Sequence, residues 1–538
     1  HRLVLVAVVA ALGSGPAPAG PPALWGHLSP GPHAVGFKSL WQLDYSRRYD
    51  MTFGDRTTYA SGKAPRPILV NVWYPAKSAD GGKAMRHRDY LDIRSADAAL
   101  AKFSSGLADY NRAVIARELL GRPAGELADK ERRLLDEFLD TPTACARGAA
   151  AEGKFPVVIY HAGHGSSFED NSVLCEFLAS HGYVVLGSAF QEPGGSSFGV
   201  DGKHTSAADM QFLAAYARQL PGADWSRVGV VGHSGGAHAA LILRAQGGCP
   251  ADAVVSLDTT QDYYGLSDPR WDEMTAAVTK NRKNMMGPLL MVANPHAFFE
   301  MADSLPSARR YYLTLRDLGH NDFISQGRIG RGLRHRLGDP GGAEGRDGPA
   351  AVSAAYEALC DYILHFFDAE LKGDAAGKKL LATQYRDTPL GGAEPHVEYV
   401  PPGTTGPEPY REGGRRPPSP RQLRYFLHEH GRDKTLAVLR RFRKEAPGQP
   451  TEHPVFGLAL VGELLDQGKT DDAVAFRDYY RESGFDCGKM LLEWGKAYLR
   501  QGRTALARDY FKKALVLDPS NGEAADRLKE AEKAPDGR

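Results

Sequence analysis

A serine set between closely spaced glycines is the residue whose surroundings most clearly suggest covalent chemistry. Gly232-His-Ser-Gly-Gly236 matches the pattern G-x-S-x-G, with Ser234 at its centre. The apolar run 228–231 before it predicts a short buried strand, and the small residues at the start of 237–245 predict a tightly packed helix. In such a strand, sharp turn and helix, a serine hydroxyl stands clear of the sheet as a nucleophile. Because the chain contains 60 glycines, the motif gains weight only from partners elsewhere in the sequence.

The first partner required is a general base, because a serine hydroxyl is a weak nucleophile at neutral pH. In the order typical of α/β hydrolases, the acid and then the histidine follow the serine. His320 lies in Leu318-Gly-His-Asn321, a short loop after the predicted strand 311–315, and is the favoured base. The other histidines considered are His233, His238 and His296, of which the first two lie too close to Ser234 in sequence.

The second partner is a carboxylate that orients the histidine. Asp258 directly follows the predicted strand 253–257, the first strand after the serine. The commoner position is one strand later, where the sequence reads Ala293-Asn-Pro-His296 and offers no carboxylate. Asp258 is therefore the favoured acid, and the alternatives are Asp262, Glu300 and Asp303.

A nucleophile of this kind needs backbone N–H groups that stabilise the oxyanion formed during acyl transfer. One should come from Gly235, which follows the serine, and a second from Gly163 in the loop after the predicted strand 155–160. His161 and His164 in that loop lack a third metal ligand, so neither a metal nor another cofactor is expected.

Predicted strands alternate with predicted helices around this serine. The strands are expected at 67–75, 155–160, 183–187, 228–231, 253–257, 288–293 and 311–315, and the helices at 171–181, 206–219 and 354–371. This alternation predicts an α/β fold, a mostly parallel sheet flanked by helices, with its ligand at the carboxyl ends of the strands. A helical insertion at about 95–140 is either a cap over the site or a peripheral addition.

The C-terminal part is predicted to be an all-α helical-repeat domain. One copy fits the tetratricopeptide spacing through Leu491, Trp494, Gly495, Tyr498, Gly502, Ala507, Phe511, Ala514 and Pro519. Weaker copies lie upstream. The expected organisation is a hydrolase domain at 20–395, a Pro-rich linker at 396–420 and tetratricopeptide-like repeats at 421–538.

The N-terminal segment predicts export. The apolar run 3–12, followed by Ala17-Pro-Ala19, is typical of a signal peptide over 1–19, which indicates a secreted or periplasmic protein without a later membrane span. The formal net charge of +1 argues against a nucleic-acid partner. The five cysteines are scattered, with Cys145 and Cys249 the one pair considered for a disulfide.

Residues from about 35 to 374 resemble the platelet-activating-factor acetylhydrolase and dienelactone-hydrolase-like branch of the α/β hydrolases. The resemblance rests on Arg66-Pro67, Val72-Trp-Tyr-Pro-Ala76, 157–163, Gly232–Gly236, Ser256-Leu-Asp258 and Leu318–Asn321. It implies a triad of Ser234, Asp258 and His320, oxyanion donors at Gly163 and Gly235, and a part in lipid degradation. Dienelactone hydrolases proper use a cysteine nucleophile, so their activity is not implied.

The expected function is therefore that of a serine hydrolase which cleaves carboxylic esters of small molecules through an acyl-enzyme. Thioester hydrolysis, acyl transfer and peptide cleavage use the same groups and stay open. In another alternative the chain is a scaffold that recruits a protein partner through its repeats. The Gly- and Arg-rich segment 327–345 predicts a solvated loop, with Arg328, Arg331 and Arg334 as possible ligands of an anionic substrate.

Overall fold

The computed structural model describes most of the chain. The described residues are 21–53, 57–61, 63–78, 82–188, 200–259, 269–316, 318–338, 348–382, 396–404, 406–407, 409–413, 417–448, 450–500 and 502–534. The predicted signal peptide and Asp262 lie outside them.

One mixed sheet of twelve strands runs through the described residues. Its strands are β1 (Ala34–Phe53), β2 (Thr57–Ser61), β3 (Ala64–Ala76), β4 (Lys83–Arg86), β5 (Pro142–Arg147), β6 (Phe155–His161), β7 (Val184–Gly187), β8 (Ala223–His233), β9 (Ala253–Leu257), β10 (Leu289–Ala293), β11 (Arg310–Thr314) and β12 (His396–Val400). They lie in the order β12-β11-β10-β9-β8-β6-β7-β3-β1-β5-β4, with β2 paired to β1. From β7 to β11 all neighbours are parallel, so their carboxyl ends meet at one edge.

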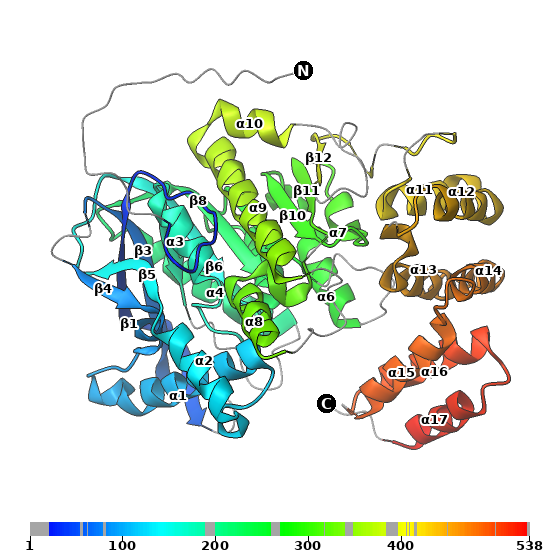
Figure 1. The fold of residues 1–538 in the computed structure, drawn as a ribbon, viewed down its shortest axis with the longest axis horizontal. Helices are drawn as coiled ribbons and strands as arrows, with labels where there is room; N and C mark the ends of the chain where they lie inside the picture. Colours follow the sequence, from blue (N-terminus) through cyan, green and yellow to red (C-terminus); the bar gives the residue numbers. More distant parts are fainter. Residues whose placement is uncertain are drawn as a thin grey trace.

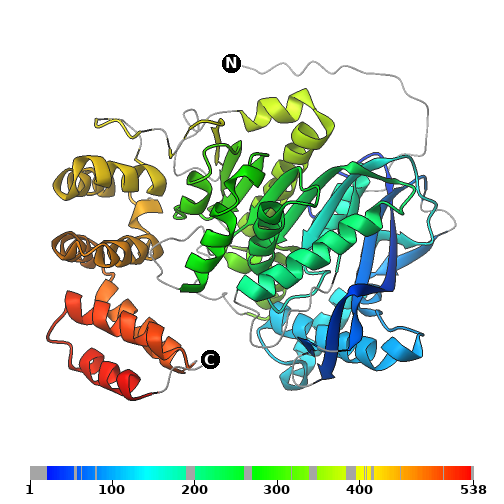
Figure 2. The same cartoon turned by 180° about the vertical axis from the view of Figure 1, so that it is seen from behind.

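Helices cover both faces of this sheet. One face carries α3 (Ser172–Ser180) and α9 (Pro349–Phe367), which lie in front of the strands in Figure 1. The other carries α4 (Val200–Ala217), α5 (Gly235–Gln246) and α6 (Pro269–Thr279), seen from behind in Figure 2. Along β6 the side chains alternate between the two cores: Val158 and Tyr160 join one, Val157 and Ile159 the other. The predicted α/β-hydrolase architecture is confirmed.

The helical insertion consists of α1 (Ala98–Leu120) and α2 (Asp129–Leu139). It packs against α8 (Ser325–Arg336), which includes the first part of the segment 327–345 expected to be a solvated loop; residues 339–345 lie outside the described part of the chain. That expectation was wrong because the glycines serve close packing: a Cβ on Gly330 would lie 2.9 Å from the Leu119 carbonyl oxygen.

The three arginines that the sequence suggests as ligands of an anionic substrate bind protein groups. Arg328 donates to the Ser353 hydroxyl at 2.9 Å, Arg331 pairs with Asp322, and Arg334 donates to the Leu119 carbonyl at 2.8 Å. Their partners fix α8 to its neighbours, so the structure gives them structural roles rather than that of substrate ligands. All five cysteines are free thiols.

The C-terminal domain is a stack of helical hairpins beside the β10–β12 edge of the sheet (Figure 1). Its helices are α11 (Pro420–His430), α12 (Arg432–Glu445), α13 (Pro454–Asp466), α14 (Thr470–Arg481), α15 (Cys487–Arg500), α16 (Thr504–Leu517) and α17 (Gly522–Lys533). In two hairpins a glycine of the first helix lies directly against a ring of the second, Gly457 against Tyr480 and Gly495 against Phe511. The predicted helical repeats are confirmed as an architecture.

The segment that joins the two domains begins inside the sheet. β12 pairs antiparallel with β11, so the first residues of the segment interpreted as a linker form an edge strand. Among the described residues, no helix has both the length and the apolar character that crossing a membrane requires.

Candidate active site

Ser234 occupies a strained turn between β8 and α5. Its φ of 50° and ψ of −117° lie outside the regions that L-residues normally adopt. The flanking glycines make this turn possible: a Cβ on Gly232 would lie 2.3 Å from the Gly236 carbonyl carbon, and one on Gly236 would lie 2.3 Å from the His161 carbonyl oxygen. No larger residue fits at either position without moving backbone, which explains the spacing of the motif.

The sheet brings Ser234, His320 and Asp258 together in one hydrogen-bonded chain. His320 lies at the start of η5 (His320–Phe323), and Asp258 directly follows β9. The His320 Nε2 atom is 2.9 Å from Ser234 Oγ, and its Nδ1 atom is 2.6 Å from Asp258 Oδ2. Because a carboxylate only accepts, Nδ1–H donates to Asp258, which leaves Nε2 to accept the serine proton.

Backbone contacts fix the position of Asp258, the carboxylate in this hydrogen-bonded series. Asp258 has a φ of 45°, which aspartate tolerates better than most residues, and its N–H donates to the Val292 carbonyl at 2.7 Å. Its side chain is only 2% exposed, whereas that of His320 is 38% exposed. The imidazole is thus accessible to a substrate while the carboxylate is shielded from water.

A second histidine supports the first, and the sequence analysis missed this role. His233 Nε2 donates to the His320 backbone carbonyl at 2.8 Å, and the two rings lie 4.9 Å apart. Burial and the proximity of His320 lower the pKa of His233 to about 3, so it stays neutral. The one local signal for this role is the position of His233 directly before Ser234, and that position argues only against His233 as the base.

The loop after β6 lies against the serine turn. A Cβ on Gly163 would be 2.9 Å from His233 Nδ1 and 3.6 Å from Ser234 Cβ. A Cβ on Gly235 would be 3.4 Å from the His164 backbone nitrogen and 2.8 Å from Lys203 Nζ. The side chain of Lys203 is buried, and its amino group lies beside Gly235, the residue that follows Ser234.

Three buried carboxyl groups accept hydrogen bonds in and around this loop. The Ser166 hydroxyl donates to Glu118 of α1 at 2.8 Å, the Ser167 hydroxyl to Glu169, and the Tyr160 hydroxyl to Asp170. Burial raises the pKa of Glu118 to about 8, and those of Glu169 and Asp170 to about 7. The insertion is therefore connected directly to the loop beside Ser234.

The structure places each of the remaining described candidates in a different setting. His238 is buried inside α5, about one turn after Ser234. Glu300 and Asp303 belong to α7 (Glu300–Asp303) and pair with Arg424 and Arg421 of the helical-repeat domain. His296 stacks on His453 of that domain. No group of three or more His, Cys, Asp or Glu residues in the described part of the chain could hold a metal ion.

Comparison with known proteins identifies one repeat. Residues 489–521, which cover most of α15 and all of α16, match the tetratricopeptide repeat model. No curated protein sequence matches the chain. Among solved structures, the chain is similar to a ferulic acid esterase from Streptomyces cinnamoneus, with a TM-score of 0.43 and 19% identity over 68% of this chain and 96% of that chain.

Proposed function

We propose that the chain is a serine hydrolase that cleaves carboxylic esters through an acyl-enzyme on Ser234. The observation that carries this proposal is the Ser234–His320–Asp258 hydrogen-bonded chain at the carboxyl ends of β8, β9 and β11. Acyl transfer requires a hydroxyl to attack, a neutral imidazole nitrogen to accept its proton and a carboxylate to stabilise the imidazolium, and these three side chains are of the types that supply them.

In the acylation step, Ser234 Oγ attacks the ester carbonyl carbon while its proton passes to His320 Nε2. The tetrahedral intermediate collapses, the bond to the alcohol oxygen breaks, and the imidazolium returns the proton to the departing alcohol. Water then attacks the acyl-enzyme with His320 again as base, which releases the carboxylic acid and restores the serine. Asp258 remains ionised throughout and holds the imidazole in the tautomer that leaves Nε2 unprotonated.

The negative oxygen of the intermediate needs donors near Ser234, and we assign one to the Gly235 amide. The Gly163 amide is the expected second donor, but its N–H also favours the ionised form of Asp170 by hydrogen bonding. The His164 amide in the same loop lies 3.4 Å from the position of a Gly235 Cβ and is an alternative donor. Two such donors typically contribute a ~10²–10³-fold rate effect each.

The resemblance to the acetylhydrolase-like branch, which also takes its acid from the strand after the serine, supports hydrolysis of a carboxylic ester and leaves the acyl group open. Thioesters, acyl acceptors other than water and peptides stay possible substrates of the same triad. A panel of short-chain nitrophenyl esters, acyl thioesters and peptides distinguishes them by their kcat/KM values.

The test of the proposed function is covalent labelling of the full chain with a fluorophosphonate probe, combined with hydrolysis of a nitrophenyl ester. Ser234→Ala should abolish labelling, and Asp258→Asn should lower kcat by ~10³–10⁴-fold because the histidine loses its orienting acceptor. Ser226→Ala is the matched control, since Ser226 lies on β8 as well but is exposed and bonds only to Asp224. Labelling of Ser234→Ala at the wild-type rate contradicts the proposal.

A second candidate function is recruitment of a protein partner by the C-terminal domain, and the tetratricopeptide match at 489–521 favours it. This function does not exclude catalysis. Its test is a binding assay in which the full chain and a Ser234→Ala variant capture the same partner equally well.

A further inference from the structure

Two consecutive phenylalanines after β10 belong to different hydrophobic cores. Phe298 packs into the core of the helical-repeat domain, with its ring 5.1 Å from that of Phe456. Phe299 packs into the core beneath the sheet, with its ring 5.0 Å from that of Tyr312. The segment that links β10 to α7 is therefore held by both domains, and we call residues 294–299 the seam loop.

The backbone of the seam loop is strained at Phe299, where successive side chains enter different cores. Phe299 has a φ of 55° and is, with Ser234 and Asp258, one of the non-glycine residues at positive φ among those described. A bulky residue in this region is strained and persists only where its surroundings hold it. Packing from both domains supplies that constraint here.

The same loop lies beside the acid of the proposed triad. β10 pairs with β9, and Val292 near the end of β10 accepts the hydrogen bond from the Asp258 amide. Just past β10 the chain turns, and His296 there is half-buried and stacks on His453 with ring centroids 4.3 Å apart and an interplanar angle of 1°. Burial is the main cause that lowers the pKa of His296 to about 3, opposed by the negative charge of Asp258.

His453 is itself held in place by the start of α13. Its Nδ1 atom accepts a hydrogen bond from the Val455 amide at 3.2 Å, so it caps the helix with the same ring that stacks on His296. Phe456, in the first turn of α13, is fully buried. Both contacts of α13 with the seam loop thus come from one rigid helix end.

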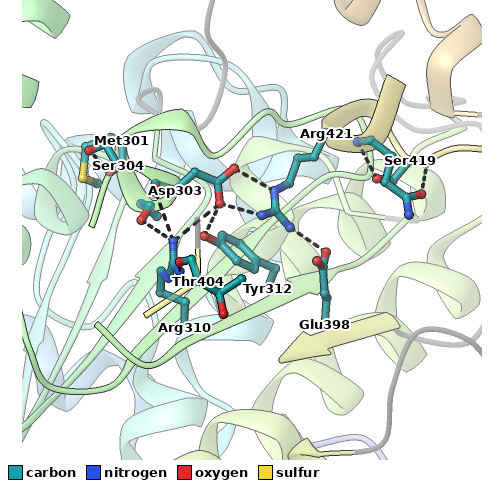
Figure 3. A network of polar contacts seen from close by, with 11 residues as sticks. Met301, Asp303, Ser304, Arg310, Tyr312, Glu398, Thr404, Ser419 and Arg421 are labelled. Atoms are coloured by element: carbon teal, nitrogen blue, oxygen red, sulfur yellow. Dashed lines mark hydrogen bonds and ion pairs between the residues drawn. The ribbon is translucent and has the colours of Figure 1, made fainter. Parts of the chain in front are cut away.

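Polar contacts fasten the adjacent helix ends. In Figure 3, Arg421 of α11 reaches across to Asp303 and Glu398, and its guanidinium lies over the Tyr312 ring. Arg424, one turn further along α11, pairs with Glu300 at the start of α7 and with Glu463 of α13. These buried and half-buried ion pairs hold α7, and with it the far end of the seam loop, against the helical-repeat domain.

We propose that the helical-repeat domain positions the acid of the catalytic triad, through the stacking of His453 on His296 and the packing of Phe456 against Phe298. This inference rests on the proposed function. It makes His296, His453, Phe298 and Phe456 positioning residues: they hold the β10 end against which Asp258 is oriented, and none of them contacts the reacting atoms. The domain is thereby part of the hydrolase as well as a repeat array.

The test separates the two contributions of His453 in the full chain. Asparagine caps helices well but has no aromatic ring, so His453→Asn keeps the cap and removes the stack. His453→Phe keeps an aromatic ring that can stack and removes the cap. If stacking positions Asp258, His453→Asn should lower the kcat for a nitrophenyl ester by ~10-fold with KM unchanged, the scale of effect expected from a small misplacement of catalytic groups. His453→Phe should keep the wild-type kcat while its melting temperature falls.

A matched control is His430→Asn, because His430 lies in the same domain with its ring 4.3 Å from that of Phe426 but away from the seam loop. It should leave kcat unchanged. The double variant His296→Ala/His453→Asn should be no slower than the slower single variant, since both changes remove one contact.

The outcomes are distinct. A folded His453→Asn variant with wild-type kcat, or a His453→Phe variant as slow as His453→Asn, overturns the inference while the proposed function stands. A wild-type chain that neither hydrolyses esters nor reacts with a fluorophosphonate overturns the proposed function, and the inference falls with it. Phe456→Leu provides a second variant. If it folds, it should also lower kcat and leave KM unchanged.

Discussion

Replacing Arg421 with methionine should loosen the attachment of the helical-repeat domain. The Arg421 guanidinium lies 2.5 Å and 3.2 Å from the two carboxylate oxygens of Asp303, 2.5 Å from Glu398, and 3.8 Å above the Tyr312 ring. The side chains of Arg421 and Asp303 are only 3% and 4% exposed. Methionine fills a similar volume but leaves the Asp303 carboxylate buried without its main counter-charge.

Breaking a buried ion pair from one side typically destabilises a protein by about 3–5 kcal/mol. Two groups moderate this effect: the Tyr312 hydroxyl donates to Asp303 at 2.6 Å, and an Arg310 nitrogen lies 3.9 Å away. We therefore expect a loss near the lower end, about 3 kcal/mol. With a urea dependence of ~1–3 kcal/mol/M, the midpoint of the transition that involves this domain should fall by roughly 1–3 M.

The assay is urea unfolding followed by circular dichroism, with hydrogen exchange used to locate the loss of protection in α7 and α11. The control is Arg432→Met, because Arg432 also pairs with aspartates, at 3.0 Å and 3.4 Å, but at the surface of α12. Exposed pairs contribute little, so this control should keep the wild-type midpoint. Equal midpoints for Arg421→Met and Arg432→Met would refute the reasoning, as would an Arg421→Met/Asp303→Asn double variant less stable than Arg421→Met alone.

Three further changes have defined outcomes. Gly236→Ala should destabilise the protein by about 1–3 kcal/mol and abolish fluorophosphonate labelling, because its Cβ would lie 2.3 Å from the His161 carbonyl oxygen. Glu118→Gln should raise the melting temperature at pH 8.5 but not at pH 5. The pKa of Glu118 is raised to about 8, so in the folded state it keeps a proton that the unfolded chain releases. Its stabilising effect is therefore lost as the pH rises through 8. Lys203→Met should lower kcat/KM by ~10-fold, because its ammonium lies 2.8 Å from the Cβ position of Gly235 beside the proposed oxyanion donor.

Each of these predictions has its own check. Gly332→Ala is the control for Gly236→Ala, since nothing lies within 4 Å of its Cβ position in α8 and a neutral or stabilising effect is expected. For Glu118→Gln, thermal melts at the two pH values suffice, and an equal shift at both contradicts the pKa assigned to this carboxyl. A Lys203→Met variant with wild-type kcat/KM shows that the cation acts on neither the substrate nor the oxyanion.

Local sequence patterns were enough to predict the elements around Ser234. Each of these elements can be recognised from a few neighbouring residues: the apolar run before the serine, the small residues after it, and the strand that ends at Asp258. Because parallel strands present their carboxyl ends at one edge, the order serine, acid, histidine was sufficient to nominate Asp258 and His320 as its partners. Their mutual distances, 2.6 Å and 2.9 Å, required the folded sheet.

Other features leave no local signature. The helix α8 forms in a Gly- and Arg-rich segment because its glycines allow close packing on α1, a contact between residues far apart in the chain. β12 continues the sheet from a segment that composition alone assigns to a linker. Each depends on a surface that exists only after other segments have folded, so no window of neighbouring residues contains the information.

The sequence by itself determined the candidate nucleophile, its strand-turn-helix setting and the presence of a helical-repeat domain, because each depends on side chains within one or two elements. Only the tertiary structure decided how that domain relates to the site. Asp303 and Arg421 are 118 residues apart, and their pairing exists because β11 and β12 bring the end of the sheet to the start of α11. A contact of this kind depends on how whole elements pack, and periodicity within one element does not encode it.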